Sequence, residues 1–210
     1  MKIAIPNQGK LRNDLLDIFN QNSKLKLNSF NERSLYTQNQ NGDEVYFLRS
    51  NDLAKLVESN IVDVGITGSD YILECQSDVK KLLDLDFCKG TLTLLVPQLC
   101  VNSTFNNLNG KTIATQYPNA SKQLLNELGL TNFEILPTSG ATEIYPALGL
   151  ADATIDVVSS GNTYKANGLV PLKELFYSSA TVFCSHNFFH SHPEKVNELV
   201  EYLKLKVSTY

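Results

Sequence analysis

The sequence predicts an α/β protein with two lobes that flank a cleft. Apolar runs of strand length alternate with amphipathic helical stretches along most of the 210 residues, a pattern typical of α/β folds. A strand, a small-residue turn and the start of a helix occur twice in related form, at 63–71 and at 156–164, aligned without gaps. Two such units favour two α/β lobes that face each other. The alternative is a chance similarity between two short segments.

The bulk composition excludes several classes of protein. A hydrophobic fraction of 42% and a charged fraction of 19% are those of a globular protein. The net charge of −4 provides no basic face for nucleic acid, so any phosphate site must be local. No apolar run approaches the about 20 residues of a membrane span, and residues 1–6 are too short for a signal peptide. We therefore expect a cytoplasmic protein without membrane contact.

The cysteines and histidines do not predict a metal site. Cys75, Cys88, Cys100 and Cys184 show no CxxC spacing, which argues against zinc and against a disulfide framework. The three histidines lie together between His186 and His192 without a cysteine or acidic partner at ligand spacing. We interpret this segment as a surface loop before a helix.

The first lobe is predicted to begin with a strand at 2–6 and a helix at 11–22, whose apolar residues recur at helical spacing. The asparagine-rich segment 28–43 reads as a loop or loose hairpin. Further elements are expected in this order: a strand at 44–48 that delivers Arg49, a helix at 52–59 capped by Ser50 or Asn51, a strand at 61–66, a helix at 69–75 and an extended stretch at 79–86.

The chain is predicted to cross into the second lobe with the strand at 91–96. After it we expect a loop or short helix at 99–110, a strand at 111–115, a helix at 118–128, a strand at 133–136, an apolar helical stretch at 144–150, a buried parallel strand at 153–158 and a short helix at 164–167. Strands at 172–178 and 180–185 are expected to return to the first lobe, before an amphipathic helix at 193–207. The predicted lobes are 1–92, completed by 178–210, and 93–177.

Four small-residue turns lead from a strand toward a helix, at 7–10, 67–70, 138–143 and 159–163. Such turns present backbone N–H groups and the positive end of a helix dipole to an anion. Four of them favour a ligand with several phosphates or two phosphorylated ligands. An ordinary strand-to-helix connection explains any one of them equally well.

The turn at 159–163 has the most specific chemistry. Its hydroxyl groups, on Ser159, Ser160 and Thr163, can donate hydrogen bonds to phosphate oxygens. Gly161 lets the backbone approach a ligand closely. Asp156 lies toward the end of the preceding strand, and its carboxylate can accept from two vicinal ribose hydroxyls.

Ordered matches along nearly the whole chain give a more specific reading. They are NQGKL at 7–11, residues 49–74 with DVGITGSD at 63–70, KTIATQYP at 111–118, SGATE at 139–143 and the block from GLAD at 149–152 to NGL at 167–169. With these segments the sequence resembles the catalytic subunit of ATP phosphoribosyltransferase, the family that begins histidine biosynthesis. Its length resembles that of the short form, which lacks a C-terminal regulatory domain.

The resemblance implies a fold like that of type II periplasmic binding proteins. It also implies transfer of the phosphoribosyl group of phosphoribosyl pyrophosphate to N1 of ATP, with pyrophosphate leaving as a complex with Mg2+. The residues implied at phosphoribosyl pyrophosphate are Asp156, Ser159, Ser160, Gly161, Asn162 and Thr163; those implied on the ATP or pyrophosphate side are Gly9, Lys10, Arg49, Thr67, Gly68, Asp70 and Glu143, with Lys89 and Glu74 as further candidates. No general acid or base is assigned, and no dedicated protein ligands are expected for Mg2+.

Partners follow from the same resemblance. Short-form members act with a regulatory subunit similar to histidyl-tRNA synthetase, in a hetero-oligomer that responds to histidine. Free strand edges and amphipathic helices also favour at least a homodimer of the chain alone.

Two departures from the family pattern affect single positions. In the segment 84–91, Asp86 replaces a glycine and the basic residue is displaced to Lys89, so the cation that this segment contributes is in question. Tyr164 stands where the family has leucine.

Other functions remain as alternatives. A small-molecule-binding protein of the same two-lobed fold would carry an export signal, and a non-catalytic interaction subunit would not need Asp156 beside a hydroxyl-rich loop. A dinucleotide-dependent dehydrogenase is excluded because no G-x-G-x-x-G motif opens a helix after the first strand.

Overall fold

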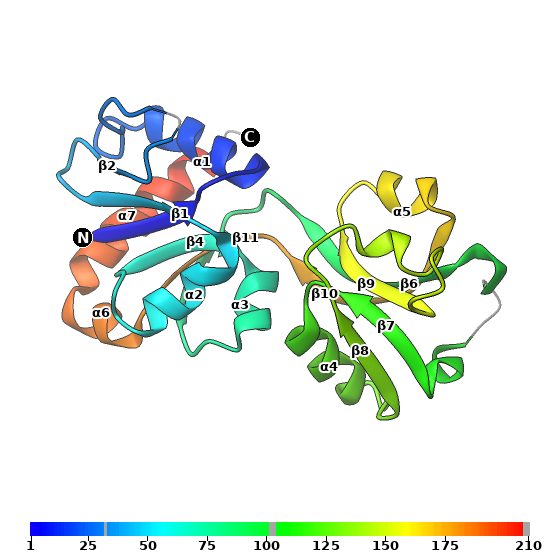
Figure 1. Ribbon diagram of the computed structural model, residues 1–210. Helices are drawn as coiled ribbons and strands as arrows, with labels where there is room; N and C mark the ends of the chain where they lie inside the picture. The colour runs from blue at the N-terminus through cyan, green and yellow to red at the C-terminus, as the bar shows by residue number, and fades with distance from the viewer. Residues whose placement is uncertain (32, 101–103, 208–210) are drawn as a thin grey trace. The chain divides into compact units, whose positions relative to one another are not determined.

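The computed structural model describes residues 1–31, 33–100 and 104–207 and divides into two compact units (Figure 1). Unit 1 comprises Met1–Cys88 and Ser179–Tyr210, and unit 2 comprises Lys89–Ser178. The boundary predicted at 92/93 falls inside strand β6 (Gly90–Pro97), whose whole length belongs to the sheet of unit 2. The unit boundary therefore lies before β6.

Unit 1 is built on a six-stranded sheet in the order β2-β3-β1-β4-β11-β5. Its strands are β1 (Lys2–Pro6), β2 (Tyr36–Gln38), β3 (Glu44–Leu48), β4 (Val64–Gly68), β5 (Lys80–Asp84) and β11 (Ala180–Cys184). The central strands β3, β1 and β4 run parallel, and the strands on either side pair with their neighbours antiparallel. The strand predicted at 61–66 corresponds to β4, which starts only at Val64.

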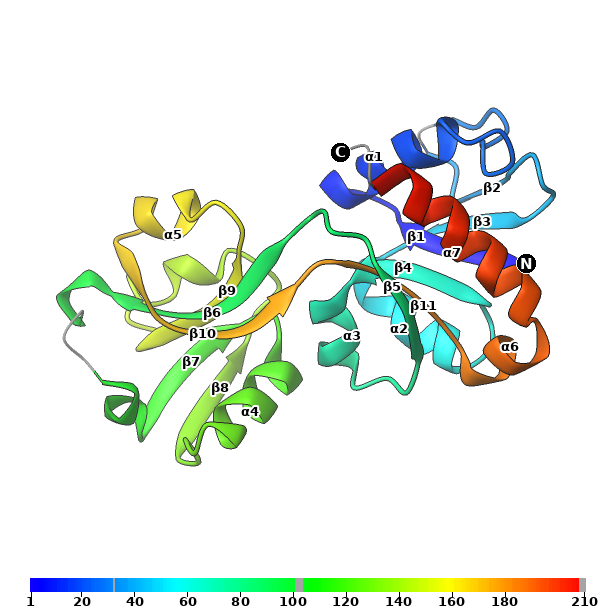
Figure 2. The ribbon, with the colours of Figure 1, turned by 180° about the vertical axis from the view of Figure 1, so that it is seen from behind.

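Helices cover both faces of this sheet (Figure 2). They are α1 (Lys10–Asn20) and α7 (Pro193–Val207) on one face, α2 (Ser50–Glu58) and α3 (Ser69–Cys75) on the other, and α6 (His186–Ser191) before α7. The alternation along β1 decides which helices each face receives. Ile3 and Ile5 belong to the core that also contains residues of α1 and α7, whereas Ala4 packs with the core under α2 and α3.

Unit 2 has a five-stranded sheet in the order β10-β6-β9-β7-β8. Besides β6, its strands are β7 (Lys111–Thr115), β8 (Phe133–Pro137), β9 (Ala153–Val158) and β10 (Leu169–Ser178); its helices are α4 (Pro118–Glu127), α5 (Asn162–Ala166) and the 3-10 turns η1 (Gln98–Cys100), η2 (Phe105–Leu108) and η3 (Thr142–Ile144). β9 pairs with β7 parallel and with β6 antiparallel. β10 pairs with β6, so the prediction that both late strands return to the first lobe is wrong for β10 and right for β11.

Both sheets contain the same arrangement of four strands. β1 lies between β3 and β4 with antiparallel β11 beside β4, and β7 lies between β8 and β9 with antiparallel β6 beside β9. Because parallel strands end at the same edge of a sheet, the turns that follow them gather there. The turns at 7–10 and 67–70 share one edge of the first sheet, and those at 138–143 and 159–163 share one edge of the second.

Three local predictions fail for identifiable reasons. Residues 144–150 form no α-helix beyond the short η3, because Pro146 provides no N–H and Ile144, Leu148 and Leu150 are 40%, 61% and 55% exposed, so little burial stabilises a helix. The histidine segment is helix α6 rather than a loop, since Ser185 caps it by accepting from the Phe188 N–H at 3.1 Å. Neither Ser50 nor Asn51 caps α2, which begins at Ser50 after Arg49 without a side-chain cap.

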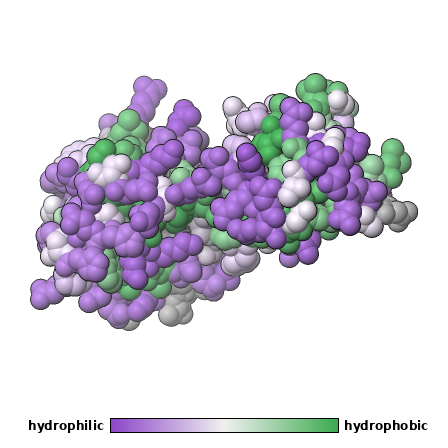
Figure 3. All heavy atoms as spheres, turned by 90° about the horizontal axis from the view of Figure 1, so that it is seen from below, coloured by the Kyte–Doolittle hydropathy of each residue, from purple (hydrophilic) through white to green (hydrophobic). Residues whose placement is uncertain are grey.

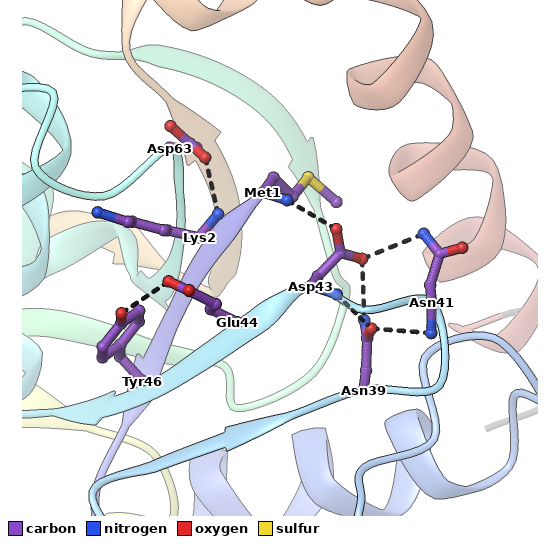
Figure 4. A network of polar contacts seen from close by, with 8 residues as sticks. All are labelled: Met1, Lys2, Asn39, Asn41, Asp43, Glu44, Tyr46 and Asp63. Carbon is purple, nitrogen blue, oxygen red and sulfur yellow. Dashed lines mark hydrogen bonds and ion pairs between the residues drawn. The ribbon is translucent and has the colours of Figure 1, made fainter.

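A polar network fixes the amino end of β1 (Figure 4). Asp63, just before β4, accepts from the Lys2 N–H at 2.7 Å, and Asp43, just before β3, accepts from the Met1 amino group at 2.8 Å. Although burial works in the opposite direction, hydrogen bonds from Met1, Asn39 and Asn41 hold the pKa of Asp43 below its ordinary value. These carboxylates set the register of the three parallel strands at the edge opposite the turns.

The surface is largely polar on the face drawn in Figure 3. Among the described residues, none of the helices has both the length and the apolar composition that crossing a membrane requires.

One glycine of the first strand-to-helix segment has a packing role that its sequence context did not reveal. Gly65 on β4 lies opposite Phe183 on β11, and a Cβ at this position would come within 2.4 Å of the Phe183 ring. Since the ring is fully buried, it has no room to move aside. Gly65 is therefore required by the aromatic side chain that covers it.

We expect Gly65→Ala to destabilise the protein by roughly 1–3 kcal/mol through overpacking. Urea unfolding measures the effect, and Gly65→Ala combined with Phe183→Leu should recover part of the loss. Gly42→Ala is the control: its φ is +82° with no atom within 4 Å of a new Cβ, so it has only a backbone cost of about 1 kcal/mol. Wild-type stability of Gly65→Ala, or simple additivity in the double variant, would contradict this packing.

Candidate substrate-binding site

The 159–163 loop joins β9 to α5 at the carboxyl edge of the second sheet. Ser159, Ser160, Asn162 and Thr163 are exposed, so their hydroxyl, amide and backbone groups are available to a ligand. Gly161 has φ 75° and precedes α5 as its N-cap. This left-handed conformation favours glycine, and a Cβ there would also come within 3.0 Å of the Tyr164 ring. Because α5 has only five residues, the loop's own N–H groups must supply most of any attraction for an anion.

Asp156 lies on β9 next to this loop, and donors surround its carboxylate. Oδ2 accepts from the Thr142 hydroxyl and Oδ1 from the Val157 N–H, both at 2.7 Å, and the Gln116 side chain contributes another hydrogen bond. Burial raises the pKa of Asp156, and the charge of Glu143 adds to this, while the three donors oppose it. The carboxylate is thus a partly buried group at the edge of the loop.

Glu143 and the loop line a common cavity of about 50 Å³, together with Val157, Val158, Ser159, Ser160, Gly161, Thr163 and Tyr164. The volume suits one small polar group rather than a whole nucleotide. The family resemblance implies Glu143 on the ATP or pyrophosphate side. The structure places it on the wall of the loop that was assigned to phosphoribosyl pyrophosphate.

Lys89 is the first residue of unit 2 and lies at the edge of the second sheet where the 159–163 loop starts. Antiparallel pairing sets Thr91 of β6 opposite Val158, the last residue of β9, and Gly90 approaches the Val157 side chain closely enough to exclude a Cβ. The exposed Lys89 immediately before it therefore lies at the sheet edge from which the 159–163 loop starts. The displaced basic residue noted in the sequence is a cation near this loop.

In unit 1, the predicted residues gather at the carboxyl edge of β3, β1 and β4. Gly9, with φ 87°, is the N-cap of α1, and Arg49 is the exposed N-cap of α2. Lys10 on α1 forms an ion pair with Asp14. The Cys88 thiol donates to the same Asp14 carboxylate at 3.2 Å; burial first, and then this contact, raises the pKa of Cys88 to about 11.

Thr67, Gly68 and Asp70 stand at the end of β4, but they do not form a loop. β4 ends at Gly68 and α3 begins at Ser69 with no residue between them. The Thr67 hydroxyl is buried and has no hydrogen-bond partner among the described residues, and Asp70 is also buried. Glu74 lies in the last turn of α3, so the structure does not bring it to this edge.

The apparent repeat between 63–71 and 156–164 aligns the helix starts but not the strands. Asp63 precedes β4 and accepts from the Lys2 N–H. Its structural counterpart is Asp152, which precedes β9, accepts from the Thr112 N–H at 3.0 Å and pairs with Lys111 at 2.9 Å. These contacts, the backbone hydrogen bond first, hold the pKa of Asp152 below its ordinary value. Asp156 therefore has no equivalent in unit 1.

Comparison with known proteins decides the family. A family model described as ATP phosphoribosyltransferase matches residues 49–205. The ATP phosphoribosyltransferase of Sulfurisphaera tokodaii is 38% identical over 207 residues, which are 97% of this chain and 72% of that protein. The chain belongs to the ATP phosphoribosyltransferase family.

Solved structures show the fold of this ATP phosphoribosyltransferase family member. The chain is similar to one in the ATP phosphoribosyl transferase (HisG:HisZ) complex from Thermotoga maritima, with a TM-score of 0.86, 22% identity and 100% coverage of both chains. It is also similar to the substrate-binding protein of an amino acid ABC transporter, with a TM-score of 0.61, 14% identity and coverage of 97% of this chain and 92% of that one. The two-lobed fold of the periplasmic-binding-protein type is thereby confirmed.

Within the described ranges 1–31, 33–100 and 104–207, no three His, Cys, Asp or Glu side chains are grouped so that they could hold a metal ion.

The contact between Cys88 and Asp14 makes a prediction that does not depend on activity. Asp14→Asn removes the charge that favours the protonated thiol, so the pKa of Cys88 should fall and its alkylation by iodoacetamide should become several-fold faster, at about tenfold per pKa unit. Peptide-resolved mass spectrometry measures this rate. Cys184, whose pKa burial raises to about 11, is the control within each sample. Equal rates for Cys88 in both proteins would show that it does not contact Asp14.

Proposed function

We propose that this chain transfers the phosphoribosyl group of phosphoribosyl pyrophosphate to N1 of ATP and releases pyrophosphate, the first step of histidine biosynthesis. Membership of the ATP phosphoribosyltransferase family supports the reaction. The observation that carries the site is the pairing of Asp156 with the exposed 159–163 loop at one edge of the second sheet. That pairing combines a hydroxyl-binding carboxylate with a phosphate-binding loop.

In this proposal the loop and Asp156 hold phosphoribosyl pyrophosphate. The N–H and hydroxyl groups of Ser159, Ser160, Gly161, Asn162 and Thr163 donate to the 5′-phosphate. Asp156 accepts from the ribose hydroxyls. The carboxylate has about four acceptor positions, and three donors already use some of them. A ribose that offers two hydroxyls therefore competes with the donors now present.

The ATP and pyrophosphate groups are assigned to the edge of the first sheet. The residues proposed there are Gly9, Lys10, Arg49, Thr67, Gly68 and Asp70. Lysine and arginine bind phosphate oxygens through charge-assisted hydrogen bonds, and the ion pair of Lys10 with Asp14 is an exposed contact worth only about 0.3–0.5 kcal/mol. A polyanion can therefore displace Asp14 from Lys10. Glu143 and Lys89 are proposed to act beside the loop, whereas Glu74 has no proposed role.

The reaction depends on the alignment of the reacting atoms and on stabilisation of the separating charges rather than on proton transfer. Adenine N1 attacks with its lone pair, and pyrophosphate leaves without needing a proton, so no general acid or base is required. Mg2+ prefers phosphate oxygens and water over an all-protein cage, and we propose that it arrives with the pyrophosphate group. The protein's part is to align the reacting atoms and to stabilise the separating charges.

A binding protein of the same fold is the second candidate, because the chain is similar to a transporter substrate-binding protein. Mixing the purified chain with ATP, phosphoribosyl pyrophosphate and Mg2+ separates the two. Formation of phosphoribosyl-ATP supports the transferase, and ligand binding without product supports the binding protein.

Asp156→Asn should weaken binding of phosphoribosyl pyrophosphate by roughly 1–3 kcal/mol, the range for a hydrogen bond to a charged group. The amide keeps the size of the side chain but removes its charge and one acceptor. Calorimetric titration measures the effect, with circular dichroism as the check of folding. Unchanged affinity in a folded variant would remove Asp156 from the site.

We also propose that the chain acts with a regulatory subunit, as the HisG:HisZ complex of Thermotoga maritima suggests. Because the residues proposed at the ends of the parallel strands are assigned to the two substrates, we expect histidine to inhibit only when the regulatory subunit is present. An activity titration with histidine, with and without the subunit similar to histidyl-tRNA synthetase, tests this. Strong inhibition of the isolated chain would refute it.

A further inference from the structure

The Asp156 carboxylate is held from outside its own strand by a residue that the sequence did not single out. We propose that Thr142 is a positioning residue, whose hydroxyl keeps Asp156 ionised and oriented for the ribose of the substrate. This inference rests on the proposed role of Asp156 and adds a residue through which that role is controlled.

The Thr142 hydroxyl reaches the Asp156 carboxylate from a different element, the 3-10 turn η3. The side chain is fully buried, and its hydroxyl donates to Asp156 Oδ2, with 2.7 Å between the two oxygen atoms. The backbone before it is unusual: Gly140 has φ 149° and Ala141, a non-glycine residue, has φ 49°. Left-handed conformation is strained for a non-glycine residue and persists only where surrounding structure maintains it. This turn sets the start of η3, and so Thr142, against Asp156.

The other groups around Asp156 show why this donor matters. The Val157 N–H and the Gln116 side chain also donate to Asp156, and the charge of Glu143 acts on it. Thr93, opposite Asp156 on β6, directs its hydroxyl to the Thr91 carbonyl instead. Burial and Glu143 both favour the protonated acid, so each lost donor moves the carboxyl toward its neutral form.

A purely structural role for Thr142 predicts something different. A buried hydroxyl that only satisfies a neighbour would, when removed, reduce stability and lower activity by the same factor at every pH. A positioning role predicts an effect that depends on pH, because it acts through the ionisation of Asp156. Thr142→Ser keeps the hydroxyl and should therefore behave like the wild type, whether the role of Thr142 is structural or positioning.

Thr142→Val is the decisive substitution, since it keeps the shape and removes the donor. The acid limb of kcat/KM for phosphoribosyl pyrophosphate should move to higher pH, with about a tenfold loss on that limb for each unit by which the pKa of Asp156 rises. KM for phosphoribosyl pyrophosphate should rise, while KM for ATP should stay nearly constant. Thr142→Ser should restore the wild-type limb.

Thr154→Val is the matched control. Thr154 lies on the same strand, is also fully buried, and donates its hydroxyl to the Ala114 carbonyl at 2.9 Å rather than to Asp156. The Thr154→Val variant should be less stable than the wild type, but the acid limb of its kcat/KM should not move. If Thr142→Val does not fold, Thr142→Ala takes its place in the comparison.

A titration without substrate separates this proposal from the proposed function. The pKa of Asp156, followed by carboxyl carbon NMR, should be higher in Thr142→Val than in wild type and in Thr142→Ser, whether or not the chain makes phosphoribosyl-ATP. An unchanged Asp156 pKa, or an acid limb that moves equally in Thr154→Val, would overturn the role of Thr142. Absence of product from wild type, with the pKa shift present, would overturn the proposed function alone.

Discussion

The parallel alignment of three strands in each sheet is the constraint on which the rest of the structure depends. β3, β1 and β4 in unit 1, and β8, β7 and β9 in unit 2, are held in register by backbone hydrogen bonds. Their carboxyl ends must therefore coincide, and ligands of open α/β sheets bind at such edges. The polar turns, scattered along the sequence, meet at one edge of each sheet for this reason.

Carboxylates fix the opposite edge of each sheet. Asp63 and Asp152 each accept a hydrogen bond from a backbone N–H at the start of the neighbouring parallel strand. Both units therefore hold this edge with the same type of hydrogen bond. The units differ where the strand meets the helix: β4 runs directly into α3, while β9 is followed by Ser159, Ser160 and Gly161 before α5. At this connection the second unit exposes a loop beside the Asp156 carboxylate, and we propose the phosphoribosyl site there.

Much of the fold was predictable because its strands are dense runs of β-branched and apolar residues with polar turns between them. The bounds of β1, β3, β7 and β9 agree with the prediction. Tertiary contacts decide what the sequence could not show. Asp63 and Asp156 have the same local sequence context but different partners, Thr142 acquires its role from a residue 14 positions away, and Gly65 is required by a ring on β11. At 144–150, apolar spacing suggested a helix that exposure and Pro146 prevent.

The central claim is that the 159–163 loop of this ATP phosphoribosyltransferase family member binds the phosphate of phosphoribosyl pyrophosphate. Amide hydrogen exchange with and without this compound and Mg2+ tests the claim most directly, because the loop's N–H groups are the proposed donors. We expect exchange to slow in peptides that cover 159–166, where the exposed backbone now depends on a helix of only five residues. Unchanged exchange across 159–166 at saturating concentration would contradict the account.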